Sequence, residues 1–229
     1  MKKYTIYVGV VLALLFAGVS TAHAQVGKPL NLWTAGINVG LNRNNMEFQP
    51  EIKTGNFSKM HFGLTGRYIH ENYFSMISGI QLELNYSQRG WAEKFDGDGD
   101  MRSYSHTLNY IEVPLLAHLG FGHETGNQFF LHLGPQFGFL VSESSDFGGE
   151  GWTDDLKDSD NYREKVDNTF NYGIVGGAGV ELKTKMGHFL LEGRYYYSLA
   201  DIYSNAKKEY FDRSAPTTVE ITFTYLIDL

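Results

Sequence analysis

The sequence of 229 residues contains no cysteine. Its absence excludes a disulfide-stapled scaffold, a thiolate metal site and a lipoprotein anchor that is acylated on cysteine. The folded chain must therefore be held together by strand pairing and side-chain packing alone.

Long apolar runs are also missing, except at the N-terminus. The run from Tyr4 to Val19 follows Lys2 and Lys3 and precedes the small-x-small sequence Ala22-His23-Ala24. This order predicts a secretory signal peptide over residues 1–24 and a mature domain over residues 25–229. An uncleaved anchor fits less well, because a membrane helix needs about 20 apolar residues and the cleavage signal is good.

Basic residues are scarce, with 19 Lys and Arg against 26 Asp and Glu. Loss of Lys2 and Lys3 with the signal peptide would lower the net charge from −7 to −9. A basic surface for nucleic acid is therefore not expected. Glycine (26), tyrosine (15) and phenylalanine (16) are plentiful, which suits a crowded interior and a membrane interface.

A strict alternation dominates the segment from Leu108 to Leu119. One face is apolar, and the other is mixed and carries Glu112 and His118. Because a strand presents its side chains with period two, this segment is predicted to be a strand with one apolar face. An apolar face opposed by a polar one is typical of a barrel in lipid, with the apolar side outward.

Seven other segments alternate in the same way. The eight candidate strands cover residues 33–42, 60–68, 74–91, 108–119, 129–142, 170–182, 189–199 and 218–229. Long polar connections follow the odd-numbered strands and short ones follow the even-numbered strands, including a tight turn at residues 70–73. This predicts an all-β, eight-stranded, antiparallel, up-and-down transmembrane barrel in an outer membrane, with both termini periplasmic. Pro114 and Pro135 predict bulges.

Four motifs carry a family resemblance: Tyr86 to Trp91 (YSQRGW), Tyr110 to Leu116 (YIEVPLL), Gly173 to Glu181 (GIVGGAGVE) and Leu191 to Tyr195 (LEGRY). With them the mature chain resembles the PorT-like outer-membrane β-barrels of Bacteroidetes-type, Gram-negative bacteria. The resemblance implies a small membrane barrel, and one branch of that family is implicated in protein secretion. Leu229 departs from the terminal aromatic residue that is common in such barrels.

Ionisable residues recur on the predicted inner face. Buried charges must pair or change protonation state, so we expect a salt-bridged interior, with His61, His118 and His132 as further members. A proton pathway or an acid–base pair is the alternative. Trp33 and Trp91 are predicted at the two lipid interfaces. The predicted interior set is Arg67, Glu83, Arg89, Glu112, Glu181, Glu192, Arg194 and Glu220.

No metal, cofactor or catalytic residue is expected. Asp96, Asp98 and Asp100 resemble the start of a calcium loop, but Met101 and Thr107 replace its glycine and glutamate. The glycines from Gly173 to Gly179 lie inside an alternating strand, so they make room for bulky neighbours and do not bind a dinucleotide. Nucleophile-elbow, zinc and P-loop patterns are missing.

The connection over residues 143–167 is strongly acidic, with a net charge of −6. It is a solvated face that could attract cations or a basic protein partner. We predict a structural or interaction protein in contact with outer-membrane lipid, without an open pore, because eight strands enclose a lumen that side chains fill. The alternatives are a secretion-accessory barrel, a membrane-embedded enzyme using loop residues, and a soluble lipocalin-like ligand carrier, which would be apolar inside.

Overall fold

The computed structural model describes residues 28–49, 54–55, 57–73, 76–93, 102–122, 126–157, 162, 166–203 and 213–229. The predicted signal peptide (1–24) and the aspartates at 96, 98 and 100 lie outside the described residues. The strands are β1 (Lys28–Gln49), β2 (Thr54–Gly55), β3 (Phe57–Tyr73), β4 (Met76–Glu93), β5 (Ser103–Gly122), β6 (Gln128–Gly148), β7 (Phe170–Thr184), β8 (Gly187–Ser198) and β9 (Arg213–Asp228), and the short helix is α2 (Asp154–Lys157).

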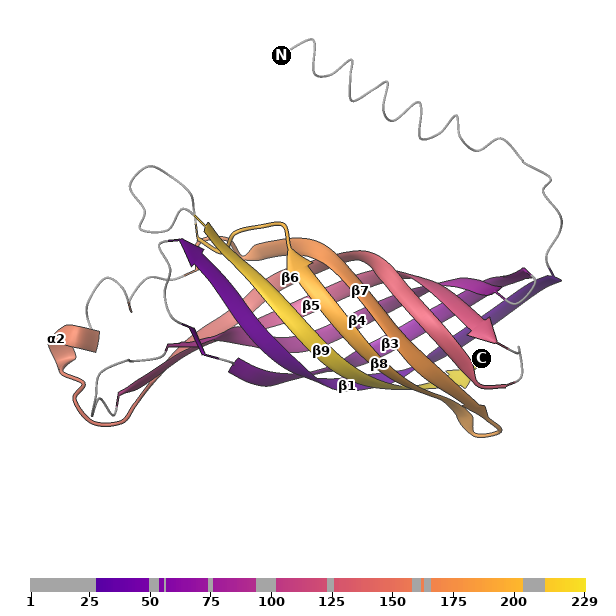
Figure 1. The fold of residues 1–229 in the computed structure, drawn as a ribbon, viewed down its shortest axis with the longest axis horizontal. Coiled ribbons are helices and arrows are strands. Elements are labelled where there is room, and N and C mark those ends of the chain that lie inside the picture. The colour runs from indigo at the N-terminus through magenta and orange to yellow at the C-terminus, as the bar shows by residue number, and fades with distance from the viewer. Residues whose placement is uncertain are drawn as a thin grey trace, which may run out of the picture.

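The eight long strands form a closed antiparallel barrel (Figure 1). Neighbours in sequence pair with one another, the first and last strands pair as β1–β9, and β2 adds two residues to the edge of β4. Closure leaves no long edge strand, and every strand can satisfy its backbone groups on both sides. The predicted eight-stranded up-and-down barrel is confirmed.

Alternation along each strand sorts the side chains into two environments. Apolar residues point outward and are exposed, as with Ile37 (59%) and Leu133 (61%), whereas polar and charged residues point into the lumen and are buried. A soluble ligand carrier has the opposite arrangement. Among the described residues, no helix is long and apolar enough to cross a membrane.

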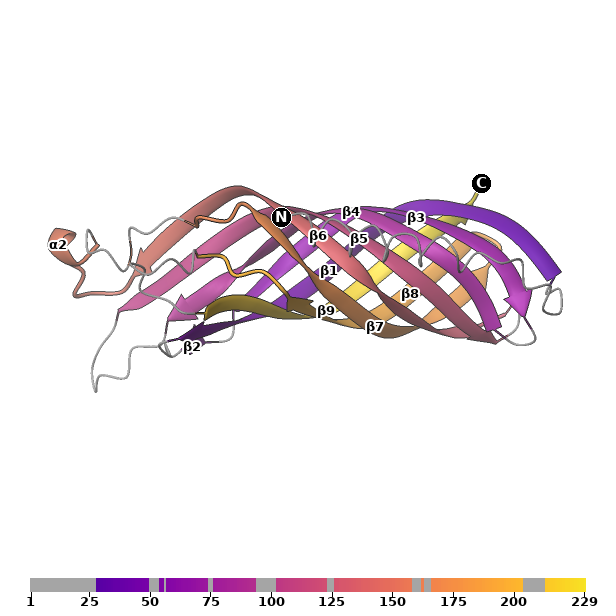
Figure 2. The ribbon, with the colours of Figure 1, turned by 90° about the horizontal axis from the view of Figure 1, so that it is seen from above.

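The two ends of the barrel differ, as Figures 1 and 2 show. The helix α2, the end of β6 and the start of β7 lie at one end, called here the loop end. The short turns lie at the other, called here the turn end, together with the start of β1 and the end of β9. Several strands run further than predicted. Residues 70–73 continue β3, and β6 extends to Gly148.

The expected bulges at Pro114 and Pro135 are wrong. Pro114 pairs with Gln136 and Ala117 with Leu133 in one continuous register. Each proline removes one N–H donor but inserts no residue, so the register is kept. The irregularity between β5 and β6 lies instead at Asn109/Tyr110, nearer the loop end.

Candidate functional site

The middle of the lumen is organised by Arg194 on β8. Its guanidinium donates to both carboxylate oxygens of Glu83 at 2.8 and 2.6 Å and to Glu192 at 2.8 Å. Gln81 and Asn85 donate to the same Glu83 carboxylate at 2.7 and 2.9 Å. The paired, fork-like geometry gives each buried charge an opposite charge and further hydrogen bonds.

Two histidines extend this layer toward the turn end. His132 lies 2.9 Å from Glu192, and His118 lies 2.9 Å from His132. Closer still to the turn end, Arg67 donates to Glu181 at 2.7 and 2.8 Å, and His188 lies 2.6 Å from the same carboxylate. The carboxylates of Glu83, Glu181 and Glu192 therefore hold arginine as well as histidine side chains in place.

Arg89 organises a third layer, nearer the loop end. Its side chain lies 2.6 Å from Glu112 and 3.8 Å from Glu220, and its guanidinium covers the ring of Tyr196 at 4.0 Å. Gln136 donates to the second oxygen of Glu112 at 3.0 Å. Arg89, not Arg194, is thus the cation that meets Glu112.

All eight ionisable residues predicted for the interior point into the lumen and are buried, each at most 4% exposed. Sequence reasoning missed His188, because the predicted strand over residues 189–199 begins one residue after it, whereas β8 begins at Gly187. It also missed the partners Gln81, Asn85 and Gln136. Their positions along the strands place all three on the inner face. Nothing in the sequence singled out these uncharged amides as partners of the charged residues.

Glycines make room for these long side chains. A Cβ on Gly177 would lie 2.9 Å from Cγ of Arg194, and a Cβ on Gly179 would lie 2.5 Å from Cζ of Phe130. Real Cβ atoms essentially never come this close to other heavy atoms, apart from their bonded neighbours. The glycine-rich motif of β7 is therefore a close-packing device in the barrel wall.

Two apolar clusters pack against the polar layers. At the loop end, Val166, Ile202 and Tyr203 from the connections pack with Trp91, Leu108 and Tyr110. Phe130, Leu190 and Leu226 form a second cluster beside the Arg67–Glu181 pair, since Leu190 pairs with Glu181 across the strands. The arginines and glutamates of the three layers are each at most 4% exposed, so the ion pairs are shielded from water.

The prediction that Trp91 faces lipid is wrong. Trp91 is 6% exposed and stacks on His106 inside the barrel, with ring centroids 4.7 Å apart. It shares the inward parity of Arg89, since alternate residues of a strand share a face. Trp33 does point outward, is 59% exposed and packs on Tyr68 near the turn end.

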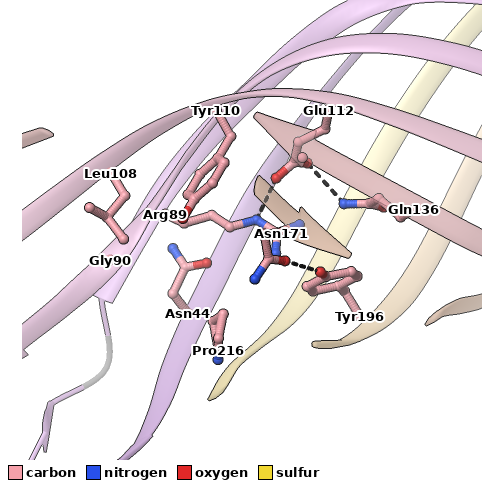
Figure 3. Close-up of a pocket in the computed structure, with 11 residues that line it drawn as sticks. Asn44, Arg89, Gly90, Leu108, Tyr110, Glu112, Gln136, Asn171, Tyr196 and Pro216 are labelled. Atoms are coloured by element: carbon pink, nitrogen blue, oxygen red, sulfur yellow. Dashed lines mark hydrogen bonds and ion pairs between the residues drawn. The ribbon is translucent and has the colours of Figure 1, made fainter. Parts of the chain in front are cut away.

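One small cavity lies in the Arg89 layer, bordered by the loop-end cluster (Figure 3). Its volume is about 10 Å³, roughly the space for one water molecule. It is therefore no channel and does not admit an organic ligand. The lining residues are Asn44, Arg89, Gly90, Leu108, Tyr110, Glu112, Gln136, Gly138, Asn171, Tyr196 and Pro216.

Beyond the outward apolar band, the loop end carries a cluster of aromatic side chains. Rings in contact within the cluster have their centroids 4.7 to 5.9 Å apart. Its members are Tyr104, Phe147, Trp152 and Tyr162. Tyr162 donates to Glu93 at 3.1 Å. Burial, together with the charge of Glu93, raises the pKa of Tyr162 to about 12. The cluster ties the long acidic connection to the barrel.

The acidic connection begins later than predicted. Residues 143–148 belong to β6, and Glu143 points inward there. The described acids that remain exposed are Asp146, Glu150, Asp154 and Asp167. Exposed acid side chains and the aromatic cluster thus both lie at the loop end.

The closed strand order, outward apolar face and ionic lumen define a small outer-membrane β-barrel. Residues 23–204 match the family described as outer membrane protein beta-barrel domain, and the chain belongs to that family. This membership assigns it to the outer membrane. No curated protein matches the chain.

Several solved structures resemble this fold at low identity. Ail, the attachment invasion locus protein of Yersinia pestis, is 12% identical over 89% of this chain and 100% of its own, with a TM-score of 0.36. OprG from Pseudomonas aeruginosa is 14% identical over 89% and 99%, with a TM-score of 0.46. Neisserial surface protein A is 7% identical over 86% and 98%, with a TM-score of 0.42.

Proposed function

We propose that this protein is a sealed outer-membrane barrel that acts as a structural or interaction protein through its loop end. The carrying observation is the closed lumen, which three arginine-centred layers of buried ion pairs fill, with an apolar cluster over them at the loop end. A lumen filled in this way transmits no solute of porin size. Its outward apolar face contacts outer-membrane lipid, with Trp33 at the interface near the turn end.

The orientation follows from the unequal connections. In outer-membrane barrels the short turns are periplasmic and the long loops are extracellular. The loop end is accordingly extracellular and both termini are periplasmic, with residues 1–24 serving as a cleaved signal peptide. The exposed acids of the long connection then face the medium, where they attract cations or a basic partner protein.

The test for closure is purified protein in a planar bilayer under voltage, with an open porin as positive control. We expect no stable conductance steps, and reproducible steps of porin size would overturn the sealed-barrel function. Partner recognition is tested with a basic peptide in salt titrations. Changing Asp146, Glu150 and Asp154 to Asn should weaken its binding, whereas Asn31→Ala at the turn end should not.

The resemblance to PorT-like barrels favours a second candidate, an accessory role in protein secretion. It rests on the four motifs named above, each of which contributes a lumen residue to the ion-pair layers (Arg89, Glu112, Glu181 and Arg194). The measurement is the secreted protein profile of a deletion strain. An unchanged profile would contradict this role and leave the sealed-barrel proposal untouched.

A further inference from the structure

Near the loop end, the paired strands β5 and β6 bring a serine, a histidine and a glutamate together. His106 pairs with Ser145 in the register, and Glu143 lies two residues earlier on the same strand. The bulge at Asn109/Tyr110 shifts the alternation by one residue, so Ser142 is exposed outside and Glu143 turns inward. Without the bulge, alternation along β6 would place Glu143 and Ser145 on the outer face. The bulge therefore brings them to the same side as His106.

The hydrogen bonds run in a chain from carboxylate to hydroxyl. Oε2 of Glu143 lies 3.3 Å from Nε2 of His106 and accepts the backbone N–H of Val166 at 3.2 Å. Oγ of Ser145 lies 2.9 Å from Nδ1 of His106. Because a carboxylate can only accept, Nε2 carries the proton, and Nδ1 is left as the acceptor for the serine hydroxyl.

The surroundings hold the imidazole and leave the serine accessible. His106 is 4% exposed beneath the stacked ring of Trp91, whereas Ser145 is exposed. The hydroxyl of Tyr104 lies 3.1 Å from Nδ1 of His106 and 3.3 Å from Oγ of Ser145. An accessible nucleophile, a base within reach and a third group that orients the base are the elements of covalent hydrolysis.

We propose that Ser145, His106 and Glu143 form an esterase site for carboxylic esters at the loop end. Oγ of Ser145 attacks the ester carbonyl carbon and passes its proton to Nδ1 of His106. The resulting oxyanion forms beside the Tyr104 hydroxyl, a donor of the kind that stabilises it. The intermediate collapses with cleavage of the ester C–O bond, and the leaving alcohol takes the proton from His106.

The second half of the reaction regenerates the serine. Water attacks the acyl-serine carbonyl, His106 takes a proton from that water, and the C–O bond to Ser145 breaks. The carboxylic acid leaves and Oγ regains its proton, so one ester and one water give one acid and one alcohol. Glu143 takes no part in the bond changes and acts as a positioning residue for His106.

A fluorophosphonate probe tests the site, since it phosphonylates only an activated serine and releases fluoride. Folded wild-type protein in vesicles should be labelled on Ser145, as mapped by mass spectrometry, and should hydrolyse p-nitrophenyl butyrate. Ser145→Ala should abolish both, and His106→Gln should slow both roughly 100-fold or more, the size of a general-base contribution. Ser144→Ala is the matched control, since Ser144 pairs with Thr107 and carries no role in the chain.

Each variant is first checked for folding by its resistance to denaturation in detergent. If His106→Gln does not fold, Glu143→Gln takes its place, with an expected loss of about 10-fold or more and a shifted pH profile. Absence of labelling in the folded wild type, or labelling that survives Ser145→Ala, overturns the esterase site. Either result leaves the closed lumen, which the bilayer experiment tests separately, unaffected.

Discussion

Arg194 and Glu83, 111 residues apart in sequence, are joined across the lumen by two hydrogen bonds of 2.8 and 2.6 Å. Their strands, β8 and β4, are not neighbours in the barrel. The pair therefore crosses the interior and links opposite walls. It also occupies the space through which a solute would have to pass.

Removing the guanidinium of Arg194 should leave the carboxylates of Glu83 and Glu192 without the arginine that they share. We expect Arg194→Met to lower the free energy of unfolding by about 3–5 kcal/mol, since a buried charge without its partner is costly. Arg43→Met, at an exposed position of β1, should change it by less than about 0.5 kcal/mol. The measurement is urea unfolding in lipid vesicles. Partial recovery in the double variant with Glu83→Gln is expected, and no recovery would argue against the pair.

Two glycines on neighbouring strands offer a contrast in packing. Gly179→Ala would press a methyl group against Phe130 and the backbone of β8, whereas Gly193→Ala meets no heavy atom within 4 Å. Overpacking typically costs about 1–3 kcal/mol, so the first variant should be destabilised by that amount. The second should match the wild type in the same unfolding titration. Equal midpoints for both variants would mean that the lumen is looser than described.

Ile174 and Val175 test which face of β7 meets lipid. Ile174 is 48% exposed and Val175 is 1% exposed. A fluorophore attached at position 174 should be quenched by lipid-borne quenchers, and one at position 175 should be protected. Ile174→Arg should also cost about 2–4 kcal/mol if the residue lies at the bilayer midplane. Quenching at 175 alone would reverse the facing of the whole strand.

Two of the three tryptophans, Trp33 and Trp91, test the facing of β1 and β4 by the same quenching method. In single-tryptophan variants, Trp33 should be quenched from the lipid, because its side chain points outward. Trp91 should resist both lipid-borne and aqueous quenchers, because it is buried against the loop-end cluster. Strong lipid quenching of Trp91 would restore the interfacial position that the sequence suggested.

Barrel architecture could be read from the residues because strand side chains alternate with period two. In a closed barrel that alternation separates lipid-facing from lumen-facing positions, such as the exposed Ile174 and the buried Glu112. Long and short connections gave the up-and-down order for the same local reason. None of these inferences needs to know which strands lie opposite each other.

Tertiary structure decided everything that depends on closure. Whether Glu112 meets Arg89 or Arg194 is set by strand number, tilt and register, which together determine the side chains that share a layer. The bulge at Asn109/Tyr110 reverses the alternation of β6, and with it the environment of Glu143 and Ser145. The parity of Trp91 with Arg89 already placed it on the inner face, but its packing against Val166 and Ile202 from the connections is a long-range contact that no local pattern encodes.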